Sequence, residues 1–446
     1  MTGDNKQQVL IIGAGPAGLF AARKLVEDGY RVVILNRDIK PGGLAEYGIY
    51  YDKYVIKNGL RKQFKQIMAL PEVEYIGNVT VGENADITLK ELQELGYKTI
   101  LVTAGAQRIK SLGLEGENLD GVYHAKNVVF HYNNLPPYST DKYRIHGRVA
   151  IVGVGNVMMD VAHWAIRDLK VDEVLAIARR GPAEVKFTAK EMEHIFNNLD
   201  REDFESEMKR CAPVMETVGQ NMFQAKEFIL SASETAEPKV SDSKMRFRFL
   251  ASPTRIIGNE KGEVIGLEIE DNKLVLKGDD TKAVGLGTKQ VLDIDAVVFC
   301  IGDKVDKDLG LPVEWDQFCK NPAPLYPNNG ISYEAYDPIA GQPIEGIFLA
   351  GWSREASTGL VGTAKKDGEC CVKAAEEFLL KETSAKTNPD LSKELEKRLR
   401  QSARQLIFKE DILKLEKDEQ DQIKKLGLKD FKYRTNDEML SVINKK

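Results

Sequence analysis

One pattern occurs twice in this chain of 446 residues, and it constrains the fold more than any other feature. Val9-Leu-Ile-Ile-Gly-Ala-Gly-Pro-Ala-Gly18 has its counterpart in Val149-Ala-Ile-Val-Gly-Val-Gly-Asn-Val-Met158. In each copy a short apolar run is followed by glycines and then by residues with helical periodicity, at 19–27 and 161–169. A second apolar run comes after each helix, at 30–35 and 173–178. Each copy therefore predicts a strand, a tight turn, a helix and a parallel strand, which is how a dinucleotide-binding sheet begins.

Three further apolar runs end at glycine and are expected to add late strands to these two sheets, at 99–103, 296–301 and 346–351. The simplest assembly is an α/β fold with two Rossmann-like domains, the second inserted in the first. A long helix is expected at about 365–381 and a strand at 245–250, whereas 204–239 shows no clean period. The predicted ranges are 1–115 and 331–383 for the first domain, 116–330 for the second, and 384–446 for a charged, mostly helical C-terminal extension with a helix cap at Asn388-Pro389.

Composition excludes several classes of protein. Lys and Arg total 63 against 68 Asp and Glu, so the net charge of -5 gives no basic excess for nucleic acid. No apolar run reaches the roughly 20 residues that cross a bilayer, and the N-terminal residues lack a signal pattern, so we expect a cytoplasmic protein with no membrane partner. The cysteines form no CxxC pair and the histidines no HExxH motif, so no metal site is expected.

The first glycine turn has the spacing Gly13, Gly15 and Gly18 between a strand and a helix. The first glycine turns the chain tightly, the second lets the backbone approach a pyrophosphate, and the third lets the helix pack on the strand. The acidic residue that usually binds a ribose at the end of the next strand is replaced by Asn36, a neutral hydrogen-bonding partner for a ribose hydroxyl. We therefore expect a first dinucleotide at this turn.

The second turn repeats the first two glycines as Gly153 and Gly155, but Met158 stands where Gly or Ala is usual. The strand that follows ends at Arg179 and Arg180, where an NAD site would place an acid. Paired guanidinium groups bind the dianionic 2′-phosphate of NADP, which a carboxylate would repel. The second turn is therefore expected to bind NADP(H).

Two dinucleotide sites on one chain indicate a flavin, as FAD, that exchanges hydride with a nicotinamide. A thioredoxin-reductase-like enzyme is disfavoured because no CxxC pair can receive the electrons. Two alternatives are a flavoprotein subunit of a larger complex, similar to the small subunit of glutamate synthase, and a non-catalytic flavoprotein that senses nucleotides. The non-catalytic alternative is supported only by three residues that depart from the patterns expected of such an enzyme, namely Asn36, Lys53 and Met158.

Further segments resemble the adrenodoxin-reductase family of ferredoxin-NADP reductases, and the resemblance covers nearly the whole chain. They are Gly42-Gly43-Leu44 with Gly48, Lys57-Asn58, Gly153 to Ala162, Arg179 to Pro182 with Phe187-Thr188 and Lys190-Glu191, Gly351-Trp352 with Thr358-Gly359, and Asp430 to Arg434 with Glu438-Met-Leu440. The resemblance implies an FAD enzyme that moves hydride between NADP(H) and the flavin. It also implies that single electrons pass to or from a small carrier protein, a ferredoxin or flavodoxin.

The same resemblance assigns candidate site residues. Flavin contacts are expected at Gly43, Leu44, Gly351, Trp352, Thr358, Gly359, Leu360 and Val361. NADP contacts are expected at Asn156, Val157, Arg179, Arg180 and Glu191. The candidate catalytic residues are Asp160, expected near the nicotinamide, and Lys53, in the flavin-facing loop where the family carries a histidine. Ala17, inside the first turn, and Gly105, after the 99–103 run, complete the candidate cofactor-binding set.

The resemblance implies an acidic carrier, and clustered cations normally steer such a partner. Strand alternation places three cations on one face of a strand and three apolar residues on the other, namely Lys244, Arg246 and Arg248 against Met245, Phe247 and Phe249. This strand is the candidate docking surface. The oligomeric state is left open.

Overall fold

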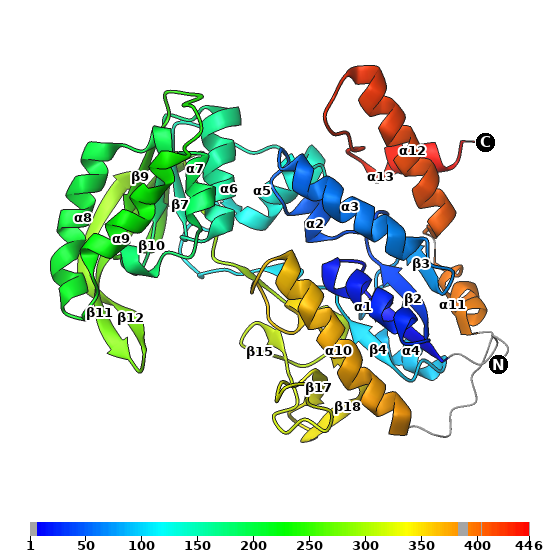
Figure 1. Cartoon of the computed structure of the whole chain (residues 1–446). Coiled ribbons are helices and arrows are strands. Elements are labelled where there is room, and N and C mark those ends of the chain that lie inside the picture. Colours follow the sequence, from blue (N-terminus) through cyan, green and yellow to red (C-terminus); the bar gives the residue numbers. More distant parts are fainter. Residues whose placement is uncertain (1–6, 382–390, 403, 446) are drawn as a thin grey trace. The chain divides into compact units, whose positions relative to one another are not determined.

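The computed structural model describes residues 7–381, 391–402 and 404–445 (Figure 1). The chain divides into two compact units: unit 1 is Met1–Ile109, Phe130–Thr140 and Gly302–Lys446, and unit 2 is Lys110–Val129 and Asp141–Ile301. Unit 2 is thus inserted in unit 1, as the repeated glycine turn predicts. The predicted helix cap at Asn388-Pro389 lies outside the described residues.

Unit 1 is built on a six-stranded sheet in the order β17-β18-β4-β1-β2-β3. All neighbouring strands are parallel except the edge pair β17–β18. The strands are β1 (Gln8–Ile12), β2 (Arg31–Asn36), β3 (Val73–Gly77), β4 (Ile100–Val102), β17 (Glu334–Asp337) and β18 (Gln342–Leu349). Sequence order reverses between β1 and β4, so the carboxyl ends of these two strands form the crevice where such sheets bind ligands.

Helices cover both faces of this sheet (Figure 1). On one face are α1 (Pro16–Glu27), α3 (Tyr54–Met68), α10 (Val361–Lys381), α12 (Lys409–Leu426) and α13 (Asn436–Ile443). On the other face are α4 (Leu89–Glu94) and α11 (Leu391–Leu399). Leu391, Leu395 and Leu399, one helical turn apart, are buried under the sheet. The predicted C-terminal extension is therefore helical, and buried apolar residues of its described part belong to the core of unit 1.

Unit 2 is built on a five-stranded parallel sheet in the order β6-β13-β7-β8-β9. The strands are β6 (Val122–His124), β7 (Arg148–Val152), β8 (Glu173–Ile177), β9 (Lys244–Arg248) and β13 (Ala296–Phe299). A separate antiparallel sheet consists of β10 (Ala251–Gly258), β11 (Val264–Lys277) and β12 (Asp280–Asp293). The helices are α6 (Asn156–Trp164), continued by a π-helical turn over Ala165–Leu169, α7 (Ala189–Glu193), α8 (Arg201–Glu216) and α9 (Met222–Leu230).

The structure differs from the sequence predictions in its domain bounds and in one helical stretch. Residues 110–115, expected in the first domain, fall in unit 2, and residues 130–140 and 302–330, expected in the second domain, fall in unit 1. Residues 302–330 do so because β14 (Asp303–Lys304) leaves the sheet of unit 2 and pairs with β5 (Arg108–Ile109). The stretch that showed no clean period contains α8 and α9. A buried stripe does run along α8, formed by Phe204, Met208, Cys211 and Met215. Its helical period was hard to recognise in the sequence, because three of these four residues contain sulfur and many charged residues lie between them.

The predicted fold class, two Rossmann-like domains with a helical C-terminal region, is confirmed. The inserted unit and the host unit are joined in part through α5 (Ala125–Tyr132), which begins in unit 2 and ends in unit 1. Among the helices of the described residues, none is long and apolar enough to cross a membrane.

Candidate functional site

The first glycine turn connects β1 to α1 in unit 1. Gly13 has a φ of +106°, and a Cβ atom there would lie 2.7 Å from the carbonyl oxygen of Thr103. A Cβ atom at Gly18 would lie 2.1 Å from the carbonyl oxygen of Gly13. At Gly15, by contrast, a Cβ atom would meet nothing within 4 Å. The outer glycines are thus required by close packing, whereas Gly15 faces open space of the kind that a ligand's diphosphate needs.

Helix α1 begins at this open position without a side-chain cap, with Gly15 as its N-cap and Pro16 following it. Five other helices do have a capping side chain, which comes from Thr88 (α4), Thr188 (α7), Asp200 (α8), Asn221 (α9) and Thr435 (α13). The first backbone N–H groups of a helix need an acceptor, and the positive end of the helix dipole favours an anion. The start of α1 is therefore suited to a phosphate group.

Other predicted residues of unit 1 surround this turn. Gly42 donates its N–H to the carbonyl oxygen of Ala14 at 2.7 Å, and a Cβ atom at Gly43 would lie 3.0 Å from the Cα atom of Gly15. Gly43 is the N-cap of α2 (Leu44–Tyr47), so Leu44 begins that short helix. A Cβ atom at Gly351 would lie 2.8 Å from the Cβ atom of Ala17. The structure thus brings segments 13–18, 42–44 and 351 together.

Two residues that the sequence analysis missed hold these segments in place. Ser353 is fully buried, and its Oγ accepts a hydrogen bond from the N–H of Gly105 at 2.9 Å. Asp367 on α10 accepts one from the N–H of Gly351 at 2.7 Å and forms an ion pair with Arg354. These bonds fasten the strand ends of β4 and β18 to each other and to α10. The partners are far apart in the sequence and follow no period, so no local signal identifies them.

The predicted flavin-facing loop after Gly351 is exposed. The indole Nε1 of Trp352 donates to the carbonyl oxygen of Thr358 at 3.0 Å, which closes the loop. Thr358, Gly359 and Leu360 are exposed, and 69% of the Leu360 surface is accessible. Val361 is the first residue of α10. An exposed leucine beside a backbone turn is consistent with a surface that a ligand ring covers, and the flavin contacts of these residues stay a prediction.

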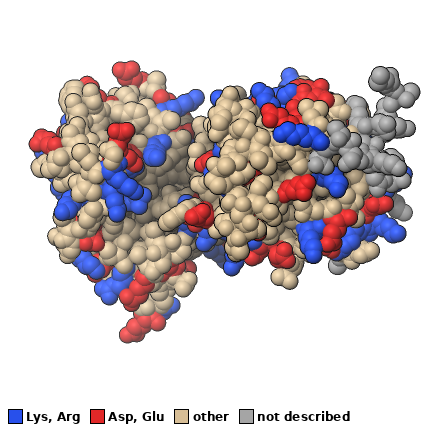
Figure 2. Space-filling model, turned by 90° about the horizontal axis from the view of Figure 1, so that it is seen from below, with Lys and Arg blue, Asp and Glu red and all other residues tan. Residues whose placement is uncertain are grey.

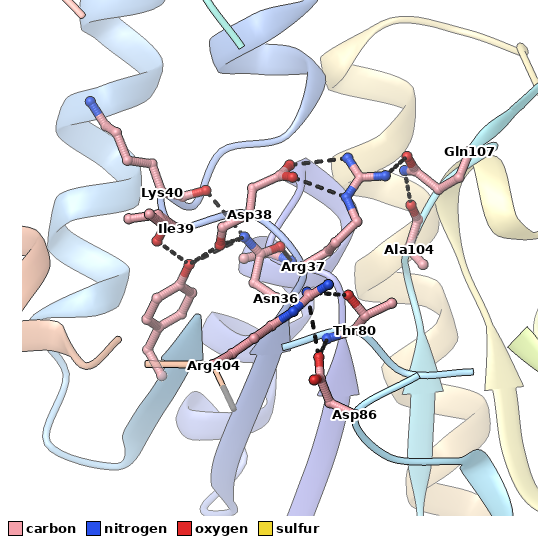
Figure 3. A network of polar contacts seen from close by, with 12 residues as sticks. Asn36, Arg37, Asp38, Ile39, Lys40, Thr80, Asp86, Ala104, Gln107 and Arg404 are labelled. Carbon is pink, nitrogen blue, oxygen red and sulfur yellow. Dashed lines mark hydrogen bonds and ion pairs between the residues drawn. The ribbon is translucent and has the colours of Figure 1, made fainter. Parts of the chain in front are cut away.

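Asn36 lies in a network of hydrogen bonds between the end of β2 and the first glycine turn (Figure 3). Its Oδ1 accepts a hydrogen bond from the N–H of Ala14 at 3.0 Å, and its Nδ2 lies 2.9 Å from the carbonyl oxygen of Asp38 and 3.1 Å from that of Lys40. The same Nδ2 is 3.2 Å from the hydroxyl of Tyr75. Because both ends of this buried amide have protein partners, Asn36 fastens the end of β2 to the glycine turn, and its contact with a ribose stays a prediction.

A group of buried and partly buried charged residues surrounds Glu46 on α2. Glu46 is paired with Lys432 at 2.9 Å and with Arg61 at 2.5 Å, and Arg61 is also paired with Asp430. Burial alone would raise the pKa of Glu46, but Lys432 and Arg61 hold it well below its ordinary value. Two of these partners come from the C-terminal region, so that region is tied directly to the segment that borders the first glycine turn.

Lys53 is half-buried and forms the N-cap of α3, one turn before the fully buried Lys57. Lys57 donates to the carbonyl oxygen of Ile49 at 3.2 Å and to Oδ1 of Asn133 at 2.6 Å. Burial lowers the pKa of Lys57 to about 6. The catalytic role of Lys53 itself stays a prediction.

The second glycine turn, in unit 2, repeats the geometry of the first. Gly153 has a φ of +128°, and a Cβ atom there would lie 2.4 Å from the carbonyl oxygen of Cys300, whereas one at Gly155 would meet nothing within 4 Å. Helix α6 begins at Gly155 without a side-chain cap. Met158, at the unusual third position, is fully buried. The helix therefore accepts a side chain there, and the open position at Gly155 is kept.

The other predicted NADP residues lie on α6 or on segments after β8. Oδ1 of Asn156 accepts the N–H of Thr188 at 3.0 Å, and Val157 next to it is exposed. Thr188 caps α7, on which Glu191 lies, 4.0 Å from Nε2 of His194. Asp160 lies on α6, one turn after Asn156, and is half-buried. The roles of Asp160 and Glu191 stay predictions.

Arg179 and Arg180 differ in their surroundings. Arg179 is exposed, whereas Arg180 donates through Nη1 to Oδ1 of Asp280 at 2.7 Å and to the carbonyl oxygen of Thr281 at 3.2 Å. Asp280 is at the start of β12, a hundred residues further along the chain. This partner was not predictable from the sequence, because it belongs to a hairpin that no local pattern connects to β8.

The candidate docking strand requires a correction. The alternation of cationic and apolar residues along β9 is as predicted, since the apolar residues 245 and 247 are buried and the cations lie on the opposite face of the strand. However, Arg246 is paired with Asp200 at 2.8 Å and with Glu173 at 2.9 Å, and Arg248 is paired with Asp271 at 2.9 Å. On the face drawn in Figure 2, Lys and Arg are interspersed with Asp and Glu. The cations of β9 are compensated by acids and do not form a basic patch.

The two turns define the class of this protein. Each unit has a wholly or mostly parallel sheet in which an interior strand runs into a glycine turn, and each turn ends at an uncapped helix with open space at its second glycine. A chain with two such turns is a protein with two dinucleotide-binding units.

Comparison with known proteins agrees with that class. The chain belongs to the pyridine nucleotide-disulphide oxidoreductase family, whose sequence model matches residues 7–321, and is therefore an oxidoreductase. It is 30% identical over 397 residues to NADPH-ferredoxin reductase FprA of Mycobacterium tuberculosis, which covers 81% of each chain. It is 28% identical over 393 residues to the mitochondrial NADPH:adrenodoxin oxidoreductase of Arabidopsis thaliana, which covers 80% of this chain and 78% of the relative. The resemblance to the adrenodoxin-reductase family is thereby confirmed.

A solved structure shows the same fold. Mycobacterium tuberculosis FprA in complex with NADPH superposes with a TM-score of 0.81 at 24% identity, covering 98% of this chain and 99% of that one.

Proposed function

We propose that this protein is an FAD-dependent NADPH–ferredoxin reductase. It would transfer hydride between NADP(H) and FAD, and single electrons between FAD and a small ferredoxin-like carrier. The observation that carries the proposal is the pair of uncapped helices, α1 and α6, each beginning at a glycine whose missing side chain leaves open space. The proposal is supported by relatives named NADPH-ferredoxin reductase and NADPH:adrenodoxin oxidoreductase.

The residues of unit 1 fit FAD. The N–H groups at the start of α1 would bind the diphosphate, with Gly15 allowing close approach. Gly43 and Gly351 border the turn on either side, and the exposed segment 358–360 would cover the flavin ring. Bound FAD supplies the conversion between two-electron hydride chemistry and one-electron transfer. The role of the chain is to position it through the Ser353 and Asp367 hydrogen bonds, which are already made in the protein.

The residues of unit 2 fit NADP(H). The start of α6 at Gly155 and Asn156 would bind the diphosphate in the same way as α1. Arg179 and Arg180 at the end of β8 would bind the 2′-phosphate, which distinguishes NADP from NAD. Asp160 on α6 would lie near the nicotinamide, and Lys53 of unit 1 would take the place of a histidine in the flavin-facing loop. A cytoplasmic location stays a prediction.

The test is a coupled assay with a purified ferredoxin and a neutral dye as alternative acceptors. We expect FAD to be released by acid precipitation, and NADPH to support reduction of both acceptors. A protein that binds FAD and NADPH but reduces neither acceptor would be a sensor or a subunit of a larger complex. Reduction of the dye alone would leave the oxidoreductase in place and contradict the ferredoxin-like partner.

A further inference from the structure

The tip of the β11–β12 hairpin contacts the residues proposed to select NADP. Arg180 donates to the carboxylate of Asp280 at 2.7 Å and to the carbonyl oxygen of Thr281 at 3.2 Å. The two side chains differ in burial, since 19% of the Arg180 side chain is exposed against 77% of the Asp280 side chain. The carboxylate therefore approaches Arg180 from the solvent side, the side from which a ligand would also come.

The structure fixes the hairpin in this position at two further points. The buried Asn272, on β11, donates through Nδ2 to the carbonyl oxygen of Arg179 at 2.8 Å. Beside Asp280, the hydroxyl of Thr281 donates to Oε1 of Glu184 at 2.5 Å. The hairpin is therefore bound to the 179–184 segment at several points, and these hydrogen bonds hold Asp280 beside Arg180.

The neighbouring arginine has no such partner. Arg179 is exposed, and in the described part of the chain its guanidinium group makes no hydrogen bond or ion pair. Of the two cations proposed for the 2′-phosphate, one is thus available and the other is already neutralised by a carboxylate.

A carboxylate and a phosphate both bind guanidinium through charged oxygens, so they compete for one arginine. They also repel each other when they are close. We propose that Asp280 is a specificity-determining residue that occupies Arg180 in place of the 2′-phosphate, so that NADP(H) must displace it. This inference rests on the proposed function of unit 2. Asp280 then weakens NADP(H) binding and leaves binding of nucleotides without a 2′-phosphate unchanged.

The test uses the purified holoprotein and two probes that differ only in the 2′-phosphate, adenosine 2′,5′-bisphosphate and adenosine 5′-monophosphate. Calorimetric titration at low salt would give the affinity of the wild type and of Asp280→Asn for each probe. We expect Asp280→Asn to bind the bisphosphate about 2- to 10-fold more tightly, the range of one exposed ion pair plus the repulsion that is removed. Binding of the monophosphate should stay the same.

Asp279→Asn is the matched control, because Asp279 is exposed at the same hairpin tip and its substitution removes the same charge. If both variants tighten the bisphosphate equally, the effect is a general one of charge, and the inference is overturned. It is also overturned if Asp280→Asn binds the bisphosphate as the wild type does, or more weakly, since Asp280 would then be neutral or would orient Arg180 productively. A wild type that binds both probes equally would contradict the NADP specificity itself.

Discussion

Replacing Lys432 with Met should destabilise unit 1 strongly, although the residue lies in the C-terminal region far from either glycine turn in the sequence. Only 5% of the Lys432 side chain is exposed. Its ammonium group lies 2.9 Å from Oε1 of Glu46 and donates to the carbonyl oxygens of Glu46 at 2.8 Å and of Asn133 at 3.2 Å. Methionine fills a similar volume but satisfies none of these three oxygens.

The size of the effect follows from these contacts. Removing one partner of a buried ion pair costs about 3–5 kcal/mol, because the other charge stays buried. Glu46 keeps Arg61, with Nε 2.8 Å from Oε2, so we take the lower end of that range. About 3 kcal/mol corresponds to a fall in melting temperature of roughly 6–12 °C, at about 2–4 °C per kcal/mol for a unit of this size.

The assay is thermal unfolding of the holoprotein followed by circular dichroism, with Lys424→Met as the control. Lys424 is in the same C-terminal region, on α12, with 78% of its side chain exposed, and a substitution there should change stability by less than about 0.5 kcal/mol. The reasoning is refuted if Lys432→Met melts within about 2 °C of the control, because the buried charge group would then contribute little.

Three further predictions test other parts of the account. Gly15→Val should abolish FAD retention, because the new side chain fills the space at the start of α1. The control Gly59→Val, also at a glycine in open space, should retain FAD, and equal flavin content in the two variants would contradict the assigned site. Arg179→Ala should raise the KM for NADPH by roughly 10- to 150-fold and spare NADH, and equal losses would indicate a structural role. The pKa of Lys57 is about 6 in the folded chain and about 10.4 in the unfolded chain, so the free energy of unfolding should rise from about pH 6 to pH 9. Denaturant titrations of Lys57→Met should lack that rise, and a variant with the same pH profile as the wild type would mean that Lys57 is charged in the folded chain.

Much of the fold was predictable from local sequence constraints. The glycine turns were found because steric limits act within a few residues: Gly18 must pass within contact distance of Gly13, and any side chain there would clash. The parallel strands followed from apolar runs that end at these turns. The insertion of one unit in the other followed from the second copy of the same pattern.

The residues that complete the sites were not predictable in this way. Ser353 meets Gly105, and Asp280 meets Arg180, only after strands far apart in the sequence have come together. A buried serine in a short loop and an aspartate at a hairpin tip each look like ordinary surface residues when the sequence is taken alone. The bonds of Asn36 to the backbone of the following loop were not predictable for a related reason, since they form only when that loop folds back on the end of β2.

Charge patterns were the least reliable guide. The alternation of β9 correctly separated its cations from its apolar residues, but the acids that neutralise the cations come from β8, from the N-cap of α8 and from β11. The charges on a single strand therefore do not identify a docking surface for a carrier protein, because acidic residues of neighbouring elements cancel the positive electrostatic potential that a row of arginines would produce.

The central claim is that NADPH bound by unit 2 reduces FAD bound by unit 1, and one measurement tests it most directly. The purified protein is mixed with NADPH without oxygen, and the visible absorbance band of the flavin is followed in time, with NADH in a parallel sample. The account predicts that NADPH bleaches this band rapidly and that NADH does so much more slowly. A flavin that stays oxidised with NADPH, in a protein that binds both cofactors, would contradict the account.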